Sequence, residues 1–150
     1  KGKYRVFSDA DGSTPIEELH KLLEPLQNKE ADISIGSRYL KESEIDTPQP
    51  FIRRVWSRLA NRVVQNILLP GIVDPHCGFK AFTYAAAEQV FSKCQVNEWS
   101  FDLEVLALAR KQELRISEVP VTWVNDERSK GKLNQMPKEI VNLYRIKKRL

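Results

Sequence analysis

The sequence predicts an α/β domain, a layered Rossmann-type arrangement in which helices flank a mostly parallel central sheet. Two observations lead to this prediction. Apolar, β-prone runs at 3–8, 31–36 and 114–124 alternate with segments of helical periodicity, an order typical of α/β layers. The 150 residues are enough for one ordinary domain with a real core, and 41% hydrophobic and 29% charged residues are globular values. We therefore expect 1–150 to form a single domain.

The strands are predicted from apolar runs. Residues 3–8 predict a buried strand, and 31–36 predict a second one with Ile33 and Ile35 on one face. Residues 41–50 are polar and contain two prolines, which predicts a loop. A turn is expected at 74–78. Two further strands are expected, a short one at 79–83 and one at 114–124 that is interrupted at Pro120.

The helices are predicted from start signals and periodicity. Thr14 is the expected N-cap of the first helix, with Pro15 at its first position and Glu17 closing a capping box. The longest helical pattern runs over 51–69, and its expected apolar face consists of Ile52, Val55, Trp56, Leu59, Val63 and Ile67. Further helices are expected at 85–91, at 101–112 with Leu103, Leu106 and Leu108 inward, and at 137–150.

Charge and cysteine content narrow the classes of partner. A net charge of +4 fits an anionic ligand or an anionic membrane surface, although many other proteins share it. Aromatic residues do not interleave the basic ones, so no nucleic-acid partner is expected. Cys77 and Cys94 form no CxxC pair, which favours free thiols over a structural zinc site. No apolar run approaches the roughly 20 residues that span a bilayer.

The segment Asp9–Ser13 carries the strongest chemical signal. Asp9 and Asp11 follow the first strand, where open α/β sheets place their ligands, and both carboxylates can turn toward one divalent cation. Hard oxygen ligands suit Mg²⁺ or Mn²⁺, particularly when substrate phosphates complete the coordination. We therefore interpret this segment as the metal and diphosphate corner of an enzyme.

Other interpretations of the segment remain open. Asp, Gly and Ser also form ordinary turns. A haloacid-dehalogenase-like phosphatase places a similar segment after a strand, with Asp9 as nucleophile and Asp11 as acid, but it needs a further acidic pair that is not evident downstream. An EF-hand loop ending at Glu18 would put Phe7 at its first ligand position and a strand before it, which argues against that site. The fourth interpretation is the metal site of a nucleotide-sugar glycosyltransferase.

Several basic and polar residues are candidate phosphate ligands. Arg38 follows the second strand and could offer a bidentate fork. Arg53, Ser57 and Asn61 lie on one flank of the long helix, where they could hold an anion or form a solvated edge. The basic loop around Arg128 could close over phosphates or be a plain turn.

Two further segments have a structural and a functional interpretation. In the turn 74–78, Gly78 permits a close backbone approach, and His76 is either a ligand or merely polar. Ser100 is the expected N-cap of the helix at 101–112, so Asp102 and Glu104 are either helix-dipole charges or carboxylates that face a substrate.

Taken together, these segments resemble family 2 glycosyltransferases, and most closely the branch of dolichyl-phosphate β-glucosyltransferases. The resemblance runs to about Lys132. The motifs that carry it are Asp9-Ala-Asp-Gly-Ser13, Ile35-Gly-Ser-Arg38, Arg53-x-x-x-Ser57, Asp74-x-x-Cys-Gly-Phe-Lys-Ala-Phe82, Trp99-x-Phe-Asp-Leu-Glu104 and Val119-Pro-Val-x-Trp123.

The resemblance implies a GT-A-like fold and inverting transfer of a hexose from a nucleotide sugar, UDP-glucose or GDP-mannose, to a polyprenyl or dolichyl phosphate. It implies Mg²⁺ or Mn²⁺ on Asp9 and Asp11, which would also bind the donor diphosphate. The acceptor phosphate would bind to Arg38, Arg53, Ser57 and Arg128, and the catalytic residues would be Asp11 and Asp102. Pro75 and His76 stand where the eukaryotic glucosyl enzymes usually have Thr-Gln, which leaves the donor open.

The resemblance also implies that part of the enzyme is missing from these 150 residues. Family members begin with strands that bind the nucleotide base, and nothing before Lys1 supplies them. We therefore expect a C-terminal fragment of a catalytic domain that is inactive alone, with an open sheet edge that invites a homodimer. The parent would lie peripherally on the cytoplasmic face of a membrane. A non-catalytic module that binds metal or a lipid surface remains the alternative, beside the phosphatase.

Overall fold

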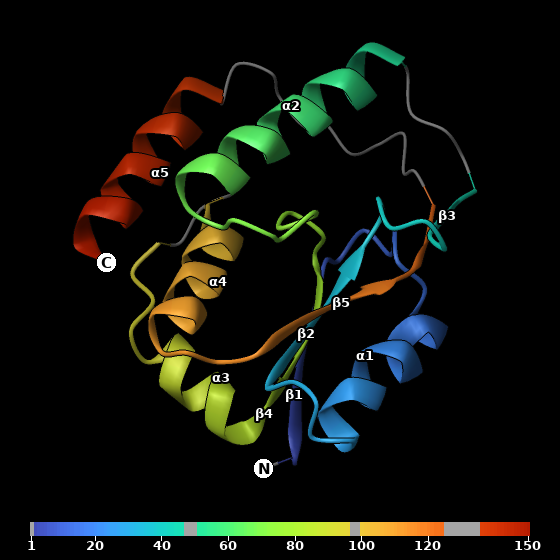
Figure 1. Ribbon diagram of the computed structural model, residues 1–150. Coiled ribbons are helices and arrows are strands. Elements are labelled where there is room, and N and C mark those ends of the chain that lie inside the picture. Colours follow the sequence, from blue (N-terminus) through green and yellow to red (C-terminus); the bar gives the residue numbers. More distant parts are fainter. Residues whose placement is uncertain (1, 47–50, 97–99, 125–135) are drawn as a thin grey trace.

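The computed structural model describes residues 2–46, 51–96, 100–124 and 136–150, with the side chains of 51–54 and 136–139 left out. It confirms the layered α/β architecture (Figure 1). Helix α1 (Leu19–Gln27) covers one face of the central sheet, and α3 (Tyr84–Phe91) and α4 (Phe101–Lys111) cover the other. Helices α2 (Phe51–Ile67) and α5 (Met136–Arg149) lie side by side beyond α4.

The central sheet is mixed. Its strands are β1 (Tyr4–Ser8), β4 (Phe79–Thr83), β2 (Ile33–Ser37) and β5 (Ile116–Pro120), in that spatial order. Strand β4 is antiparallel to both β1 and β2, whereas β2 and β5 are parallel. The expected mostly parallel sheet is thus correct for the direction of β1, β2 and β5 but wrong for the pairings, because β4 is inserted between two parallel strands. As a result, the start of β4 lies at the edge where the other three strands end.

Strand β1 is only half buried, which corrects the predicted buried strand at 3–8. It occupies an edge of the sheet, and Val6 is 43% exposed. A strand with a neighbour on one side cannot bury both of its faces as completely as a central strand. By contrast, all five residues of β2 are buried, and Ile33 and Ile35 face the same core as predicted. The homodimer through an open edge stays a prediction.

Residues 41–50 and 114–124 hold a second, smaller sheet. Strand β3 (Glu44–Ile45) lies in the expected polar loop and pairs in parallel with β6 (Thr122–Trp123). Pro120 ends β5 just before β6 begins, so the interruption predicted there is confirmed.

The expected capping box at Thr14 is wrong. The helix is preceded by a short 3₁₀ turn, η1 (Ile16–Glu18), with Pro15 at its N-cap and no side-chain cap. Instead, the Glu18 carboxylate accepts a hydrogen bond from the backbone N–H of Thr122 at 2.9 Å. The acidic group near this helix start therefore ties the helix to β6.

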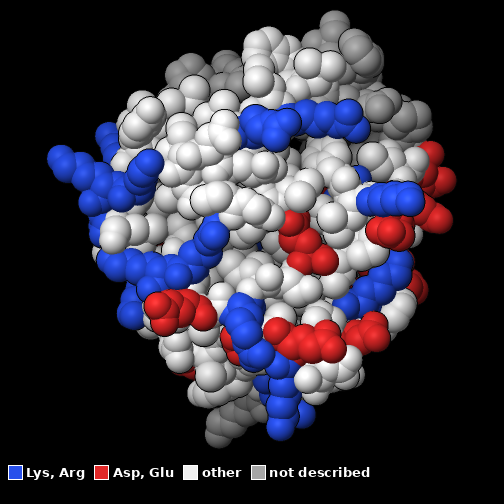
Figure 2. All heavy atoms as spheres, in the orientation of Figure 1, with Lys and Arg blue, Asp and Glu red and all other residues white. Residues whose placement is uncertain are grey.

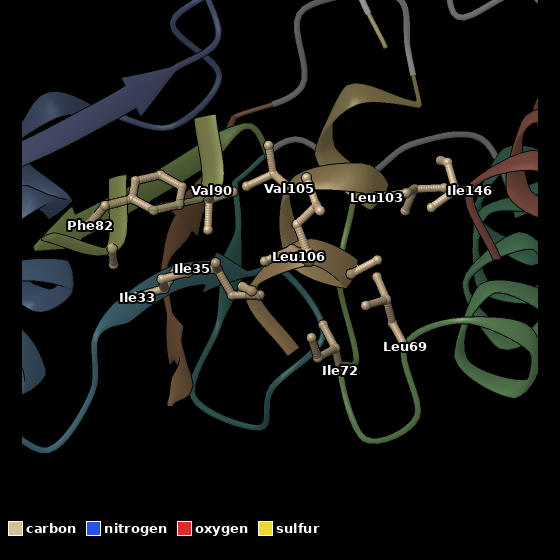
Figure 3. Close-up of a cluster of buried hydrophobic side chains, with 14 of the residues drawn as sticks. Ile33, Ile35, Leu69, Ile72, Phe82, Val90, Leu103, Val105, Leu106 and Ile146 are labelled. Atoms are coloured by element: carbon tan, nitrogen blue, oxygen red, sulfur yellow. The ribbon is translucent and has the colours of Figure 1, made fainter. Parts of the chain in front are cut away.

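The main core lies between the sheet and α4 (Figure 3). Leu103, Leu106 and Leu108 are buried, as predicted. Helix α5 joins this core through Ile146, and β2 contributes Ile33 and Ile35. A smaller core under α1, on the opposite face of the sheet, contains Leu22, Leu26, Ala31, Cys77, Phe79, Ala81 and Val121.

Glu104 is a buried structural acid within the main core. Its carboxylate accepts hydrogen bonds from the backbone N–H groups of Gln95 and Val96, at 2.9 and 2.7 Å, and pairs with Arg149 of α5. Ser100 occupies the N-cap position but makes no side-chain cap, contrary to expectation. Glu104 therefore joins the segment before α4 to the last turn of α5.

The expected apolar face of α2 is only partly buried in the described structure. Of the predicted residues, Val63 and Ile67 pack partly buried against the main core, whereas Val55, Trp56 and Leu59 are 43–52% exposed. Val64, which was not assigned to that face, is buried. The neighbouring α5 likewise exposes Ile140, Val141 and Tyr144. In the ranges that the structure describes, none of the helices combines the length and the apolar composition of a membrane span.

The core predicts a clear difference between two leucine variants. Leu106 is fully buried, so Leu106→Ala leaves a cavity, and we expect the free energy of unfolding to fall by about 2–5 kcal/mol. Leu59 is 52% exposed, and Leu59→Ala should change it by about 0.5 kcal/mol or less. Chemical denaturation of both variants measures the difference. Equal effects would contradict the core described here.

Candidate active site

Three polar side chains and one turn meet at the edge where β1, β2 and β5 end. Asp9 follows β1, Arg38 follows β2, and Asp102 lies in the first turn of α4. The turn 74–78 reaches the same edge because β4 is reversed. Open α/β sheets bind ligands at this edge, so its position favours the predicted site.

Asp9 lies directly against Gly78. The backbone N–H of Asp9 donates to the carbonyl oxygen of Gly78 at 2.8 Å. A Cβ atom on residue 78 would lie 1.8 Å from Asp9 Oδ2, so any side chain there would displace the carboxylate. The close approach that the sequence predicts for Gly78 is therefore confirmed, and its partner is the candidate metal ligand.

Asp11 is exposed two residues further along the chain. Its Oδ1 accepts a hydrogen bond from the backbone N–H of Ser13 at 2.9 Å, and Gly12 has a φ of +67°, so the segment forms a tight turn. Within the described ranges, no cluster of three or more acidic, His or Cys side chains forms a complete metal site. Asp9 and Asp11 can supply two oxygen ligands, and the other ligands would have to come from elsewhere.

The site places other negative charges around Asp9. Burial raises the pKa of the Asp9 carboxyl above its ordinary value, and the negative charges of Asp102 and Asp11 add to the rise. The positive charges of Lys80 and Arg38 oppose the shift without cancelling it. A cation bound beside Asp9 would relieve this repulsion, so the electrostatics suit a metal ligand.

Asp102 is paired with a buried lysine. Lys80 Nζ lies 2.5 Å from Asp102 Oδ1 and 2.5 Å from the carbonyl oxygen of Cys77. The Lys80 side chain is 1% exposed, and that of Asp102 is 18% exposed. Through Lys80, Asp102 is therefore connected to the turn 74–78, so it is more than a helix-dipole charge.

Arg38 forms a bidentate pair with Asp74. Its Nε and Nη2 donate to the two carboxylate oxygens of Asp74 at 2.7 and 2.8 Å, and its backbone N–H donates to Oδ2 at 3.0 Å. Burial alone would raise the pKa of the Asp74 carboxyl, but the Arg38 guanidinium brings it below its ordinary value. The fork expected to face a phosphate is therefore engaged by an internal carboxylate.

The turn at 74–78 is also held from β5 and α2. Glu118 of β5 accepts hydrogen bonds from the backbone N–H groups of Val73 and Asp74 at 2.7 and 2.9 Å. Asn61 and Gln65 of α2 both donate to the carbonyl oxygen of Val73, at 3.2 and 3.3 Å. Asn61 is 4% exposed, so it is neither a solvated edge nor free for an anion. These contacts fix the segment that positions Asp9.

His76 and Cys77 lie inside the turn. Burial lowers the pKa of the His76 imidazole, although the carboxylates of Asp74 and Asp102 oppose the shift. Burial raises the pKa of the Cys77 thiol to about 12, so Cys77 is a free thiol, as predicted, that is packed in the smaller core. A neutral imidazole can both donate and accept one hydrogen bond.

Among the other predicted phosphate ligands, Ser57 is the one whose side chain lies within the described residues. Its side chain lies near the phenol of Tyr39, and the Arg58 guanidinium lies 5.9 Å from the Tyr39 ring. The side chain of Arg53 and the whole of Arg128 lie outside the described residues. The structure thus brings Asp9, Arg38 and Asp102 to one edge and leaves the acceptor side unassigned.

Sequence reasoning missed Lys80 and Glu118 as parts of the site. Lys80 stood inside a quoted motif, but a lysine in a strand is normally exposed, so its burial was not predictable from pattern. Glu118 interrupts an apolar run, Ile116 to Val121, and an acid in such a run is the one signal that could have indicated a buried hydrogen-bonded role.

Comparison with known proteins identifies a family match and several similar proteins. "Glycosyl transferase family 2" matches residues 1–91. Among similar curated proteins, a "Dolichyl-phosphate beta-glucosyltransferase" of Trichomonas vaginalis is 36% identical over 97% of this chain, and one of Dictyostelium discoideum is 32% identical over 95%. The human protein of that name is 35% identical over 87%. These alignments cover 46%, 46% and 42% of the relatives, so the chain spans less than half of their length.

The pair of Arg38 and Asp74 predicts a pH-dependent loss of stability. Removing the cation leaves a buried carboxylate unpaired, so Arg38→Met should lower the free energy of unfolding by about 3–5 kcal/mol at pH 7. The folded-state pKa of Asp74 lies below the unfolded value of about 3.9. The wild-type pair therefore stabilises the fold above that value, and this contribution disappears as the pH falls through the folded-state pKa.

In Arg38→Met the unpaired Asp74 would take up a proton more readily, so the difference from wild type should shrink on acidification. Denaturant unfolding at pH 7 and pH 4 measures this. Arg115→Met is the matched control, because Arg115 forms an exposed pair with Asp32 and should have little effect at either pH. A difference that stays constant with pH would contradict the role of Asp74.

Proposed function

We propose that this chain, which belongs to glycosyl transferase family 2, forms part of an enzyme that transfers a hexose from a nucleotide sugar to a polyprenyl phosphate with inversion. The observation that supports the proposal is that Asp9, Asp11 and Asp102 lie close enough to act on one another at the edge where β1 and β2 end. The names of the similar proteins specify a dolichyl-phosphate acceptor and a glucosyl group. They favour UDP-glucose over GDP-mannose as the donor.

Asp9 and Asp11 would hold Mg²⁺ or Mn²⁺ together with the donor diphosphate. Both are oxygen ligands, and burial together with the nearby negative charges raises the pKa of Asp9, which a bound cation would counteract. When bound, the ion would neutralise charge on the departing nucleoside diphosphate. Gly78 and the turn behind it would keep the Asp9 carboxylate at the site.

The acceptor phosphate would bind on the side of α2. Arg53, Ser57 and Arg128 are the proposed ligands, by resemblance to the family. Arg38 binds Asp74 through Nε and Nη2, so its Nη1 would be the part that reaches a phosphate. Because the acceptor phosphate is already an anion near neutral pH, it needs orientation and charge compensation rather than a strong general base.

Asp102 would face the donor sugar.

Helices α2 and α5 would face a membrane. The last turn of α5 carries Lys147, Lys148 and Arg149, and Figure 2 shows basic side chains gathered over that end of the helix. Exposed apolar side chains on α2 and α5 accompany them. Each basic contact with anionic lipid would contribute about 1 kcal/mol, which supports a peripheral enzyme at the cytoplasmic face where a lipid acceptor is reached.

Transfer by the full-length protein tests the proposal. With Mn²⁺, we expect it to move radiolabelled glucose from UDP-glucose to a polyprenyl phosphate, and GDP-mannose serves as the competing donor. Asp9→Asn and Asp11→Asn should each lower the rate by about 100-fold or more, since they remove oxygen ligands from the ion that offsets the leaving-group charge.

Glu17→Gln is the control, because this exposed carboxylate lies outside the site. Hydrolysis of a simple phosphomonoester that Asp9→Asn abolishes would support a phosphatase instead. Binding of Mn²⁺ that no nucleotide sugar alters would support a non-catalytic module.

The contact between Asp9 and Gly78 predicts a second loss of activity. Gly78→Ala would place a methyl group where Asp9 Oδ2 lies, so the carboxylate must move and the affinity for Mn²⁺ should fall by about tenfold or more. Isothermal titration with Mn²⁺ and UDP measures it. The control Gly2→Ala adds a Cβ no closer than 3.2 Å to another atom and should bind normally. Unchanged Mn²⁺ affinity in Gly78→Ala would exclude Asp9 as a ligand.

A further inference from the structure

We propose that Lys80 is a positioning residue of this enzyme: its buried ammonium group orients Asp102 so that the second carboxylate oxygen faces the donor sugar. The inference rests on the proposed function and adds to it a group that does not touch the substrate. It is carried by the burial of Lys80, by its two short contacts and by the partial exposure of Asp102.

Lys80 lies in the middle of the sheet. It pairs with Phe7 of β1 and with Ile35 of β2, and it is 1% exposed. Its ammonium group lies 6.0 Å from the centre of the Phe7 ring. Removing an ammonium group from water is costly, and a buried ion pair is often no more stable than apolar side chains of the same volume. A requirement for stability alone would therefore not favour lysine at this position.

The contacts of Lys80 point toward the site. One hydrogen bond of 2.5 Å goes to the carbonyl oxygen of Cys77, the residue before Gly78, and the other goes to Asp102 Oδ1 at the same distance. A single ammonium group thus links the turn that positions Asp9 to the first turn of α4. A change in the position of Lys80 would therefore affect the positions of both Asp9 and Asp102.

Within the described ranges, one carboxylate oxygen of Asp102 has no hydrogen-bond donor. Only Oδ1 is engaged by Lys80, and among the described residues no hydrogen bond reaches Oδ2. The side chain is 18% exposed, so it is accessible from the site edge, and its charge acts on Asp9. A fixed carboxylate oxygen next to the metal corner is suited to accept a hydrogen bond from a sugar hydroxyl.

A double-mutant cycle in the full-length protein tests the inference. The variants are Lys80→Met, Asp102→Asn and their combination, assayed for transfer from UDP-glucose at saturating donor. If Lys80 acts through Asp102, each single variant should lower kcat by about 100-fold, the typical cost of misplacing a group at the reacting centre. The double variant should then be no slower than the slower single variant, because both remove one interaction.

Two readouts separate positioning from a general structural role. The Kd for UDP with Mn²⁺ should stay within about twofold of wild type in Lys80→Met, since Lys80 touches neither ligand. Lys93→Met is the matched control, because Lys93 is an exposed lysine that binds Gln112. It should retain the wild-type kcat. If Lys80→Met does not fold, the same cycle is run with Lys80→Arg, which keeps the charge but has a different shape.

The results distinguish failure of the role of Lys80 from failure of the proposed function. Multiplicative losses in the double variant, an unchanged kcat in Lys80→Met, or a parallel loss of UDP affinity would overturn the role of Lys80 while wild-type transfer still supports the proposed function. Absence of transfer by the wild-type protein with either donor would overturn the proposed function, and this inference with it.

Discussion

The candidate site depends on the reversed direction of one strand. Because β4 runs against its neighbours, its first residues arrive at the edge where β1 and β2 end. The turn before β4 must then fold over that edge, and its polar groups need partners there. The buried pair of Arg38 and Asp74 supplies the main one, and Glu118 binds the adjoining backbone. The acidic groups of the site therefore stand on a connected polar network and not on a loop alone.

Local pattern is enough to locate most of the elements, because apolar periodicity reports burial along one helix or strand. Local pattern does not predict features that depend on contacts between residues far apart in the sequence. The capping box predicted from Thr14 and Glu17 does not form, and the neighbouring Glu18 ties the helix start to the backbone of Thr122 instead. The direction of β4 is not encoded in its alternation, so the mixed pairing is not predictable from the run at 79–83. Nor does composition reveal that α2 leaves Trp56 exposed.

The site is predictable in part for the same reason. Asp9 and Asp102 can be selected because each follows a recognisable strand end or helix start. Lys80 cannot, because its partner is 22 positions away and a lysine in a strand is ordinarily solvated. Arg38 was selected correctly as a group at the edge, but its bidentate partner, 36 positions away, was not foreseen. The family match over 1–91 confirms the resemblance and favours the glycosyltransferase interpretation of Asp9–Ser13 over the phosphatase and the EF-hand.

The pairing of Arg149 with Glu104 has a practical consequence for recombinant work. Arg149 is the penultimate residue of these 150, yet its partner Glu104 is a fully buried residue of α4. Leu143 and Ile146 of the same helix are 2% exposed. Trimming the chain by only two positions would strand an interior acid without its cation. An expression boundary should therefore retain Arg149, and purification tags are better placed away from α5.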